Sequence, residues 1–195
     1  CSYEVNVRQK KCRVCGSLFS PLRPLQRVCG ASCALALVRT QAEEKERLES
    51  RKTIRLQKEK LKTRNDHIKE TAQAVHAYVR YRDKDKPCIS CGSPLHSKQV
   101  GGAFDAGHYR SRGSSPHLRF DADRNIHGQC KRCNRYLGGN YAAYRIGLIE
   151  RIGLDKVIEL ESDNEPRKYT IEELKEIKAR YKLKLKQLRD SNCLL

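Results

Sequence analysis

Residues 104–140 read FDAGHYRSRGSSPHLRFDADRNIHGQCKRCNRYLGGN, and cysteines tie this stretch to the chain that precedes it. Two Cys-x-x-Cys pairs, one before the stretch and one inside it, offer four thiolates: Cys88, Cys91, Cys130 and Cys133. Four thiolates grouped in this way suit a closed tetrahedral zinc site. A metal at this place would hold His108, between the pairs, and Asn134, after the last cysteine, at defined positions. A hydrolytic site needs such fixed positions.

The composition indicates small modules and a polyanionic partner. Of the 195 residues, 38% are hydrophobic, only three are Phe and none is Trp, which argues against one large core. The formal net charge is +18, and this self-repulsion adds nothing to fold stability. Nucleic acid is therefore the expected partner, and an anionic membrane surface is the second choice. No apolar run approaches the ~20 residues of a membrane-spanning helix.

The remaining cysteines predict a second zinc site. Ten cysteines would permit a secreted disulfide scaffold, but eight of them fall into close pairs, which favours metal thiolates in a reducing cytosol. Within the N-terminal module, residues 1–33, the ligands would be Cys12, Cys15, Cys29 and Cys33. Buried free thiols are the alternative. Four sulfur ligands leave zinc no open position, so both sites are expected to be structural. Cys1 and Cys193 are given no role.

Residues 34–82 predict a long charged helical segment. Residues 34–65 lack Gly and Pro, are rich in strong helix formers and carry only a thin apolar stripe, with Glu43 and Arg47 as one expected ion pair. A solvated spacer, a dimerising coiled coil and a basic rod against DNA all fit this pattern. A second helix is expected over 66–82, with Asp66 as a possible N-cap and an apolar face that packs on the zinc module after it.

Residues 83–140 and 141–195 complete a helix-rich α+β fold. The first range predicts a strand around Phe104, a loop, and a helix that begins near Asn125 or Cys130, which together give a strand-strand-helix unit. The second range predicts an amphipathic helix after Asn140, a short helix from about Asp155, and a final helix. The apolar stripes of these helices are read as core or dimer interface.

The spacing of Asn125 before Cys130, Cys133 and Asn134 resembles the HNH or ββα-metal nuclease motif. It resembles most the variant of phage endonuclease-VII-type junction resolvases, in which a structural zinc braces the fold and an Asn follows the last cysteine. Over most of the chain, the sequence resembles the NinG (Rap) recombination endonuclease family of lambdoid phages. The segments that carry this resemblance are the N-terminal knuckle, DAGHYR, RNIHGQCKRCN and the charged C-terminal helix.

The resemblance implies a role for each matching residue. His108 matches the general base, which as a neutral imidazole takes a proton from the attacking water. Asn134 matches a ligand of a catalytic divalent ion, Mg²⁺ or Mn²⁺, which would neutralise the scissile phosphate and the leaving 3′ oxygen. Asn125 matches the middle Asn of the motif, whose usual task is to pin the loop that carries the base.

The sequence offers three candidate carboxylates for the second metal ligand. In this class it is usually an Asp immediately before the His, where this chain has Gly107. Asp105 is the nearest carboxylate and requires a bent strand end, which Gly107 permits. Asp121 and Asp123 remain alternatives. His127 fits a packing role as well as it fits a metal ligand or phosphate donor.

Basic side chains near this motif are expected to hold DNA phosphates without reading sequence: Arg110, Arg112, Lys131, Arg132 and Arg135. A solvated basic surface is the alternative for each of them.

The resemblance implies a metal-dependent endonuclease that acts on branched recombination intermediates, Holliday junctions and D-loops, in the cytoplasm of a bacterial host. Symmetric cutting of a junction suggests a homodimer, and phage or host recombination proteins are possible partners. A non-catalytic zinc protein that only holds DNA is predicted equally well by the charge and the cysteines. A nuclease that acts on ordinary duplex is a weaker third hypothesis.

Overall fold

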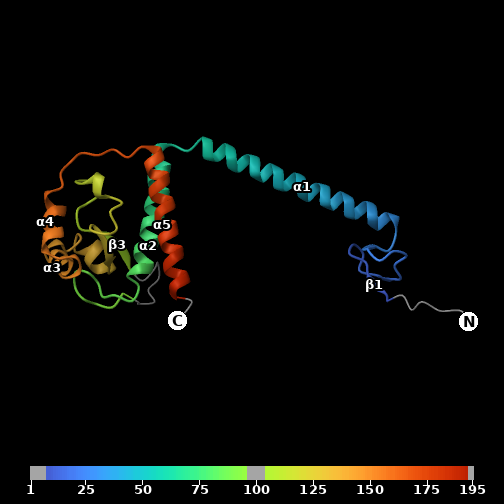
Figure 1. The fold of residues 1–195 in the computed structure, drawn as a ribbon, viewed down its shortest axis with the longest axis horizontal. Coiled ribbons are helices and arrows are strands. Elements are labelled where there is room, and N and C mark those ends of the chain that lie inside the picture. The colour runs from blue at the N-terminus through green and yellow to red at the C-terminus, as the bar shows by residue number, and fades with distance from the viewer. Residues whose placement is uncertain (1–7, 96–103, 193–195) are drawn as a thin grey trace, which may run out of the picture. The chain divides into compact units, whose positions relative to one another are not determined.

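The computed structural model describes residues 8–95 and 104–192 (Figure 1). It divides into two compact units, Cys1–Leu61 and Lys62–Leu195. Each unit carries a two-stranded antiparallel sheet and at least one helix, so the predicted helix-rich α+β class is confirmed. The division falls inside the predicted segment 34–82, and residues 83–140 and 141–195 share one unit with the helix before them. Cys1 and Cys193 lie outside the described residues.

The first unit begins with a small hairpin that carries cysteines. Strands β1 (Lys10–Lys11) and β2 (Leu18–Phe19) pair antiparallel. The turn between them needs Gly16, whose φ of 75° lies in the left-handed region that favours glycine. Cys12 is the only buried side chain of this unit among the residues that the structure describes. A module with so little apolar core depends on another source of stability.

Helix α1 (Ala31–Lys60) follows the hairpin and is exposed along its length. All of its residues are described, and none of them is buried. It begins at Ala31, before the predicted start at residue 34, and ends at Lys60, before the predicted end at residue 65. The helix ends early because Thr63 already caps the next helix. Arg47 pairs with Glu44, 2.6 Å away, and not with the predicted Glu43. The exposure agrees with the solvated-spacer interpretation.

The core of the second unit forms where helix α2 (Arg64–Arg82) runs along helix α5 (Ile171–Asn192), as Figure 1 shows. Thr63 is the N-cap of α2, and the predicted cap, Asp66, is instead the third residue of a capping box with it. The apolar face of α2 was expected to pack on the zinc module, but it packs mainly on α5 and also contacts the second sheet. Buried residues of this core include Val75, Val79, Ile126, Leu174 and Tyr181.

The second sheet pairs β3 (Asp105–His108) with β4 (Ile126–Gln129) in antiparallel register, with Gly107 opposite His127. A helix predicted from about Asn125 is therefore wrong, because residues 126–129 form a strand. The helical turn comes later, as the short π-helix η2 (Arg132–Tyr136). The pairing depends on Gly128, where an added Cβ would lie 2.7 Å from Leu95 Cδ1 and 2.9 Å from Asp83 Cβ.

The remaining helices cover the other side of the sheet region. The 3-10 turn η1 (Pro116–Leu118) lies in the loop between the strands, and α3 (Tyr141–Ile152) and α4 (Leu154–Ser162) pack together through Tyr144, Leu148, Val157 and Leu160. The Thr170 and Glu173 side chains bond each other's backbone N–H groups before α5, so the capping box is present. Among the described helices, none combines the length and apolar character needed to cross a membrane.

Asp83, the residue after α2, ties that helix to β4. Its side chain is fully buried, and its carboxylate accepts hydrogen bonds from the Arg82 guanidinium at 2.8 and 2.7 Å and from Gly128 N–H at 2.8 Å. Although burial opposes ionisation, the Arg82 hydrogen bond and charge lower the pKa of Asp83 to about 2. Asp83 is therefore ionised at neutral pH and compensates a largely buried cation.

Replacing Asp83 by Asn should lower the free energy of unfolding by about 3–5 kcal/mol at pH 7, because the Arg82 charge loses its partner. The difference between the two proteins should hold above about pH 5. It should fade as the pH falls from 3.8 towards 2, because a carboxylate with a depressed pKa loses its stabilising charge there. Denaturant unfolding at several pH values measures this. Asp85→Asn is the exposed control, and a difference that persists at pH 2 would contradict the assignment.

Candidate functional site

Two clusters of four cysteines have the geometry of structural zinc sites. In each cluster, Cys12, Cys15, Cys29 and Cys33 or Cys88, Cys91, Cys130 and Cys133, all Sγ atoms lie within 4.8 Å of one another. The distance between the Sγ atoms of Cys15 and Cys29 is 3.5 Å, and between those of Cys91 and Cys130 it is 3.7 Å. Tetrahedral zinc with bonds of about 2.3 Å places its sulfurs roughly 3.8 Å apart, and a disulfide would need about 2.05 Å. Both predicted sets are therefore compatible with zinc.

The two clusters are built on the same turn, Cys-x-x-Cys-Gly-Ser. In both, the N–H of the first cysteine donates to the serine carbonyl at 2.8 Å, and the glycine N–H donates to the first cysteine's carbonyl at 3.0 Å. The glycines, Gly16 and Gly92, have φ values of 75° and 71°. In both, the third cysteine, Cys29 or Cys130, donates its N–H to the first sulfur, at 3.4 and 3.3 Å. The chain thus uses one Cys-x-x-Cys-Gly-Ser turn in both cysteine clusters.

Within each cluster of four thiols, the pKa values shift in opposite directions. Hydrogen bonding from the Cys15 backbone lowers the pKa of Cys12 to about 6. In the second cluster burial opposes ionisation, but hydrogen bonds from Ser93 lower the pKa of Cys91 to about 6. Neighbouring thiols raise the pKa of Cys29 to about 12, and burial followed by its neighbours does the same for Cys130. A cluster of four thiolates therefore needs a cation to hold it together.

The predicted residues Asp105, His108 and Asn134 line one pocket of about 350 Å³ in the second unit. β3 supplies Asp105 and His108, and η2 supplies Asn134 immediately after the zinc cluster. In an ideal strand, residues 105 and 108 point to opposite faces. Both line this pocket here, and His108 is the last residue of β3, where the chain leaves the strand.

His108 is held with one ring nitrogen engaged. Its Nε2 lies 3.2 Å from the Arg119 carbonyl, which can only accept, so Nε2 carries the proton and Nδ1 keeps a free lone pair. Burial is the main cause that lowers the pKa of His108 to about 4, with the charges of Arg112 and Arg119 acting in the same direction. The ring is therefore neutral near pH 7 and able to accept a proton.

Asp105 and Asn134 lie side by side. Asn134 Nδ2 donates to Asp105 Oδ2 at 2.9 Å, and Arg135 donates to the two carboxylate oxygens at 2.7 and 2.8 Å. The hydrogen bond from Arg135 is the main cause that lowers the pKa of Asp105. The carboxylate is thus ionised and faces the Asn134 amide. A carboxylate and an amide both carry oxygen atoms of the kind that hard metal ions bind.

The position before His108 has no room for a side chain. A Cβ on Gly107 would lie 2.2 Å from Gln129 Oε1 and 2.9 Å from Gln129 Cβ. Gln129 is itself held by hydrogen bonds from its Nε2 to Ser90 Oγ and the Gly139 carbonyl. The usual Asp of the motif therefore does not fit on this backbone, and Asp105 is the carboxylate that reaches the pocket.

Replacing Gly107 by Ala should destabilise the protein by about 1–3 kcal/mol, because the added methyl group overpacks a fixed neighbour. The double variant with Gln129→Ala should recover part of the loss relative to Gln129→Ala alone. Thermal unfolding of the four proteins measures this coupling. A Gly107→Ala protein as stable as the parent would show that the strands separate without cost.

Asn125 lies under the loop that follows His108. Its side chain is fully buried, accepts a hydrogen bond from Arg110 N–H at 2.7 Å, and donates to the carbonyls of Arg110 and Leu118, both at 3.1 Å. These contacts join the two ends of the loop that carries His108 and Arg119. Asn125 therefore holds the loop beside the pocket without lining the pocket itself.

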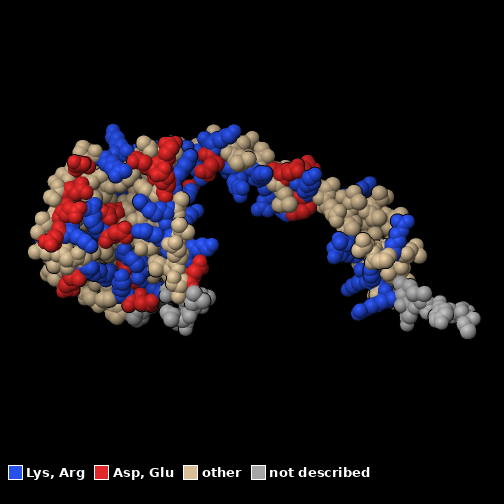
Figure 2. Space-filling model, viewed as in Figure 1, with Lys and Arg blue, Asp and Glu red and all other residues tan. Residues whose placement is uncertain are grey.

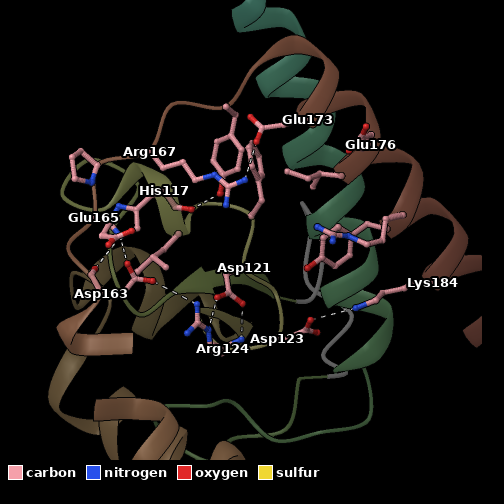
Figure 3. Close-up of a pocket in the computed structure, with 17 residues that line it drawn as sticks. His117, Asp121, Asp123, Arg124, Asp163, Glu165, Arg167, Glu173, Glu176 and Lys184 are labelled. Carbon is pink, nitrogen blue, oxygen red and sulfur yellow. Dashed lines mark hydrogen bonds and ion pairs between the residues drawn. The ribbon is translucent and has the colours of Figure 1, made fainter. Parts of the chain in front are cut away.

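The alternative carboxylates lie elsewhere. Asp121 and Asp123 line a different pocket of about 810 Å³ (Figure 3). Asp121 is bound there by Arg124 at 2.7 Å, and Asp123 is 3.3 Å from Lys184 Nζ. Neither lines the pocket of His108, whereas Asp105 does.

His127 has a structural environment. Its side chain is buried, with Nδ1 3.2 Å from Arg82 and Nε2 3.3 Å from the Arg124 carbonyl. Burial, followed by the Arg82 charge, lowers the pKa of His127 to about 3. It lies on β4 opposite Gly107 and does not line the pocket of His108, which favours the packing interpretation.

The predicted DNA-binding residues have different surroundings. The guanidinium of Arg110 donates to the carbonyls of Leu160, Glu161 and Asp163 and to Asn164, and so it holds the end of α4. Arg112 and Arg135 line the pocket, and Arg132 is exposed nearby. Lys131 is half-buried and already has an interaction. Of the five predicted DNA-binding residues, only Arg112 and Arg135 therefore line the pocket.

Sequence analysis missed two pocket residues on α2, His76 and Arg80. Both had been assigned to a helix that was expected only to pack. Their spacing of one helical turn was a signal, because residues four apart share a helix face and these two flank the buried pair Val75 and Val79. Nothing local linked that face to His108, which comes from a distant strand.

The basic charge is distributed unevenly. Figure 2 shows basic and acidic side chains interleaved over the visible face of the second unit. In the zinc module of the first unit, residues 8–42 contain no Asp or Glu, and their charged side chains are all Lys or Arg. The regions around both cysteine clusters, one in each unit, therefore carry Lys and Arg side chains that a polyanion could contact.

Comparison with known proteins places the chain in a family. The family model described as "Bacteriophage Lambda NinG protein" matches residues 5–191. Proteins named "Protein ninG" from Salmonella phage P22 and Escherichia phage lambda are 52% and 50% identical over 138 residues, which cover 71% of this chain and 65% of each relative. Another from Escherichia phage 933W is 43% identical over 198 residues, covering 94% of this chain and 95% of the relative. No solved structure matches. The chain therefore belongs to the NinG family.

Proposed function

We propose that the protein is a metal-dependent DNA endonuclease with an HNH-like ββα-metal core. The observation that carries this proposal is the single pocket in which a neutral His108, with Nδ1 free to accept a proton, faces the ionised Asp105 and Asn134. The order of strand, strand and short helix around this pocket, braced by four cysteines, agrees with such a core.

The donor set fits a hard divalent ion, Mg²⁺ or Mn²⁺. Asp105 Oδ2 and Asn134 Nδ2 are 2.9 Å apart. Neighbouring ligands of an octahedral ion with bonds of 2.0–2.1 Å are separated by about the same distance, roughly 2.9 Å. Turning the Asn134 amide over replaces Nδ2 by Oδ1 and gives two adjacent oxygens. When bound, such an ion would neutralise the phosphate and the leaving 3′ oxygen.

The protein's own groups account for the rest of the reaction. The Arg119 carbonyl fixes the His108 tautomer, so that Nδ1 takes a proton from the water that attacks phosphorus. Asn125 keeps this loop in place through its three hydrogen bonds. Arg112 and Arg80, at the edge of the pocket, would hold the adjoining phosphates.

The substrate, partners and location belong to this proposal through the family resemblance. Branched recombination intermediates are the proposed substrate, and a homodimer would present one pocket to each of two strands. Phage or host recombination proteins are proposed partners, in the cytoplasm of a bacterial host. The basic charge of +18 supports DNA as the ligand but not its branched form.

One observation favours a second function, a zinc protein that only holds DNA. Arg135 forms two hydrogen bonds to Asp105, so a divalent ion has to displace a cation already in place. In a protein without catalysis, this ion pair would be permanent.

Cleavage of a labelled four-way junction and of linear duplex with the same sequence tests both functions, with Mg²⁺ or Mn²⁺ at equal zinc content. The parent and Asp123→Asn should cut near the branch point, and Asp105→Asn should bind the junction without cutting it. Equal cutting of the linear duplex would identify a nuclease without branch preference. Tight binding with no cutting by any form would identify a DNA-binding protein.

A further inference from the structure

His76 is a histidine of the pocket that the proposed mechanism does not use. It lies on α2, and it lines the same pocket as Asp105, His108 and Asn134. Its Nε2 is buried and has no hydrogen-bond partner. A buried polar atom without a partner is uncommon in folded proteins and indicates a strained, functional or ligand-satisfied group. His76 lines the pocket, so a group bound in the pocket is the partner considered for this nitrogen.

The ring of His76 lies beside the ring of the proposed general base. The ring centroids of His76 and His108 are 5.6 Å apart, and the rings meet edge to face at 76°. A water held by His108 lies about 3 Å from the phosphorus that it attacks. A phosphate in that position has two non-bridging oxygens, and one of them can face the ion site while the other faces α2.

A role for His76 as a metal ligand agrees less well with the structure. In the described part of the chain, the groups of metal-ligand atoms that lie within 4.8 Å of one another do not combine His76 with Asp105 and His108. Hard divalent ions also prefer oxygen ligands to imidazole nitrogen. A phosphate oxygen, which accepts hydrogen bonds from neutral N–H groups, is the better match.

We propose that His76 is a further catalytic residue, whose Nε2–H donates a hydrogen bond to a non-bridging oxygen of the scissile phosphate. The proposal rests on the proposed nuclease function. His76 would hold the oxygen on the side of α2, opposite the side of Asp105 and Asn134, and would stabilise the charge that develops on it in the transition state. Since other contacts hold the rest of the DNA, the loss of this bond should affect the cutting rate more than the affinity.

Three substitutions of His76 separate hydrogen bonding from packing. His76→Phe keeps a ring beside His108 but has no donor, His76→Gln keeps a donor amide, and His76→Ala removes both. Gln73→Ala, on the exposed face of α2, is the control. Under single-turnover conditions with Mg²⁺, the Phe and Ala variants should cut the junction about 10–100-fold more slowly with unchanged affinity, and the Gln variant should recover most of the rate.

Sulfur substitution at the scissile phosphate then identifies the oxygen. Junctions with one Rp or one Sp phosphorothioate at the mapped cut replace each non-bridging oxygen in turn. In the parent, one diastereomer should show a slowing that Mn²⁺ does not relieve, and this slowing should disappear in His76→Phe. The other diastereomer should respond to Mn²⁺ in both proteins.

Two results would overturn the inference while leaving the nuclease intact. One is a His76→Phe protein that cuts at the parental rate. The other is a slow His76→Phe protein with the parental response to both diastereomers, because His76 would then act only by supporting His108. A parent protein that binds the junction and cuts no DNA would overturn the proposed function itself, and this inference with it.

Discussion

Replacing His108 by Ala should lower the single-turnover rate of junction cleavage by about 10²–10⁴-fold and leave junction binding unchanged. The His108 imidazole is neutral, largely buried and held by the Arg119 carbonyl, with a free lone pair on Nδ1. Its loss removes the proton acceptor for the attacking water. Binding depends on basic groups that the substitution does not touch.

Added imidazole sharpens this experiment. The Ala variant leaves a cavity beside the Arg119 carbonyl, and a free imidazole molecule that enters it can again accept the proton. Cutting should therefore rise with imidazole concentration in His108→Ala and not in the parent. His117→Ala is the matched control, because His117 lies in the same loop but lines the other pocket. A His108→Ala protein that cuts at the parental rate would exclude His108 as the base.

Local spacing was enough to predict the cysteine clusters, and the family resemblance added five residues that line the pocket: Asp105, His108, Arg112, Asn134 and Arg135. A Cys-x-x-Cys turn fixes its own geometry within a few residues, and Asn134 follows such a turn directly. The position of His108 at the end of a strand came from the same motif. These features depend on neighbours along the chain, so they were readable without a structure.

Contacts between distant residues decided what the sequence did not show. β4 pairs with β3, and its Gly128 N–H donates to Asp83, a residue far from β4 in the chain. The α2 helix was assigned to the zinc module because its partner, α5, lies more than a hundred residues later, where Thr71 Oγ1 donates to the Leu174 carbonyl at 2.9 Å. The packing of α2 against α5 and the second sheet also brings His76 to the pocket.

The placement of one carboxylate in the pocket also depends on contacts between distant residues. Asp105 is the nearest of the three carboxylates to His108 in the sequence, but distance along the chain does not show which of Asp105, Asp121 and Asp123 reaches the pocket. Only the pairing of β3 with β4 places Asp105 next to Asn134. Only the packing of the loop beside α5 turns Asp123 towards Lys184. Register and packing, and not residue type, made the difference.

The third cysteine of each cluster offers a matched pair of substitutions with large and different expected effects. Cys29 and Cys130 occupy the same place in the repeated turn, and each should cost the protein one zinc ion when replaced by Ser. Apparent binding free energies of structural zinc are about 10–16 kcal/mol, which equals or exceeds the ~5–15 kcal/mol stability of a whole domain. The local fold should therefore not survive the loss.

The two variants should differ because the two units have different cores. In the described part of the first unit only Cys12 is buried, so Cys29→Ser should unfold the hairpin and leave the second unit folded and able to cut. Cys130→Ser should disorder the cluster of Cys88, Leu95, Phe104 and Cys133, and with it the position of Asn134. Cutting should then be lost, while the α2 and α5 core remains protected.

Zinc content and limited trypsin digestion distinguish these outcomes. Each variant should hold one zinc ion where the parent should hold two, and new cleavage sites should appear in residues 8–30 for Cys29→Ser and around residues 130–140 for Cys130→Ser. Chelating only the divalent ion of the pocket should stop cutting and change neither pattern, because Asp105 and Asn134 are held by the protein itself. A Cys130→Ser protein that loses its zinc and still cuts the junction would mean that the cysteine cluster does not support the pocket of His108.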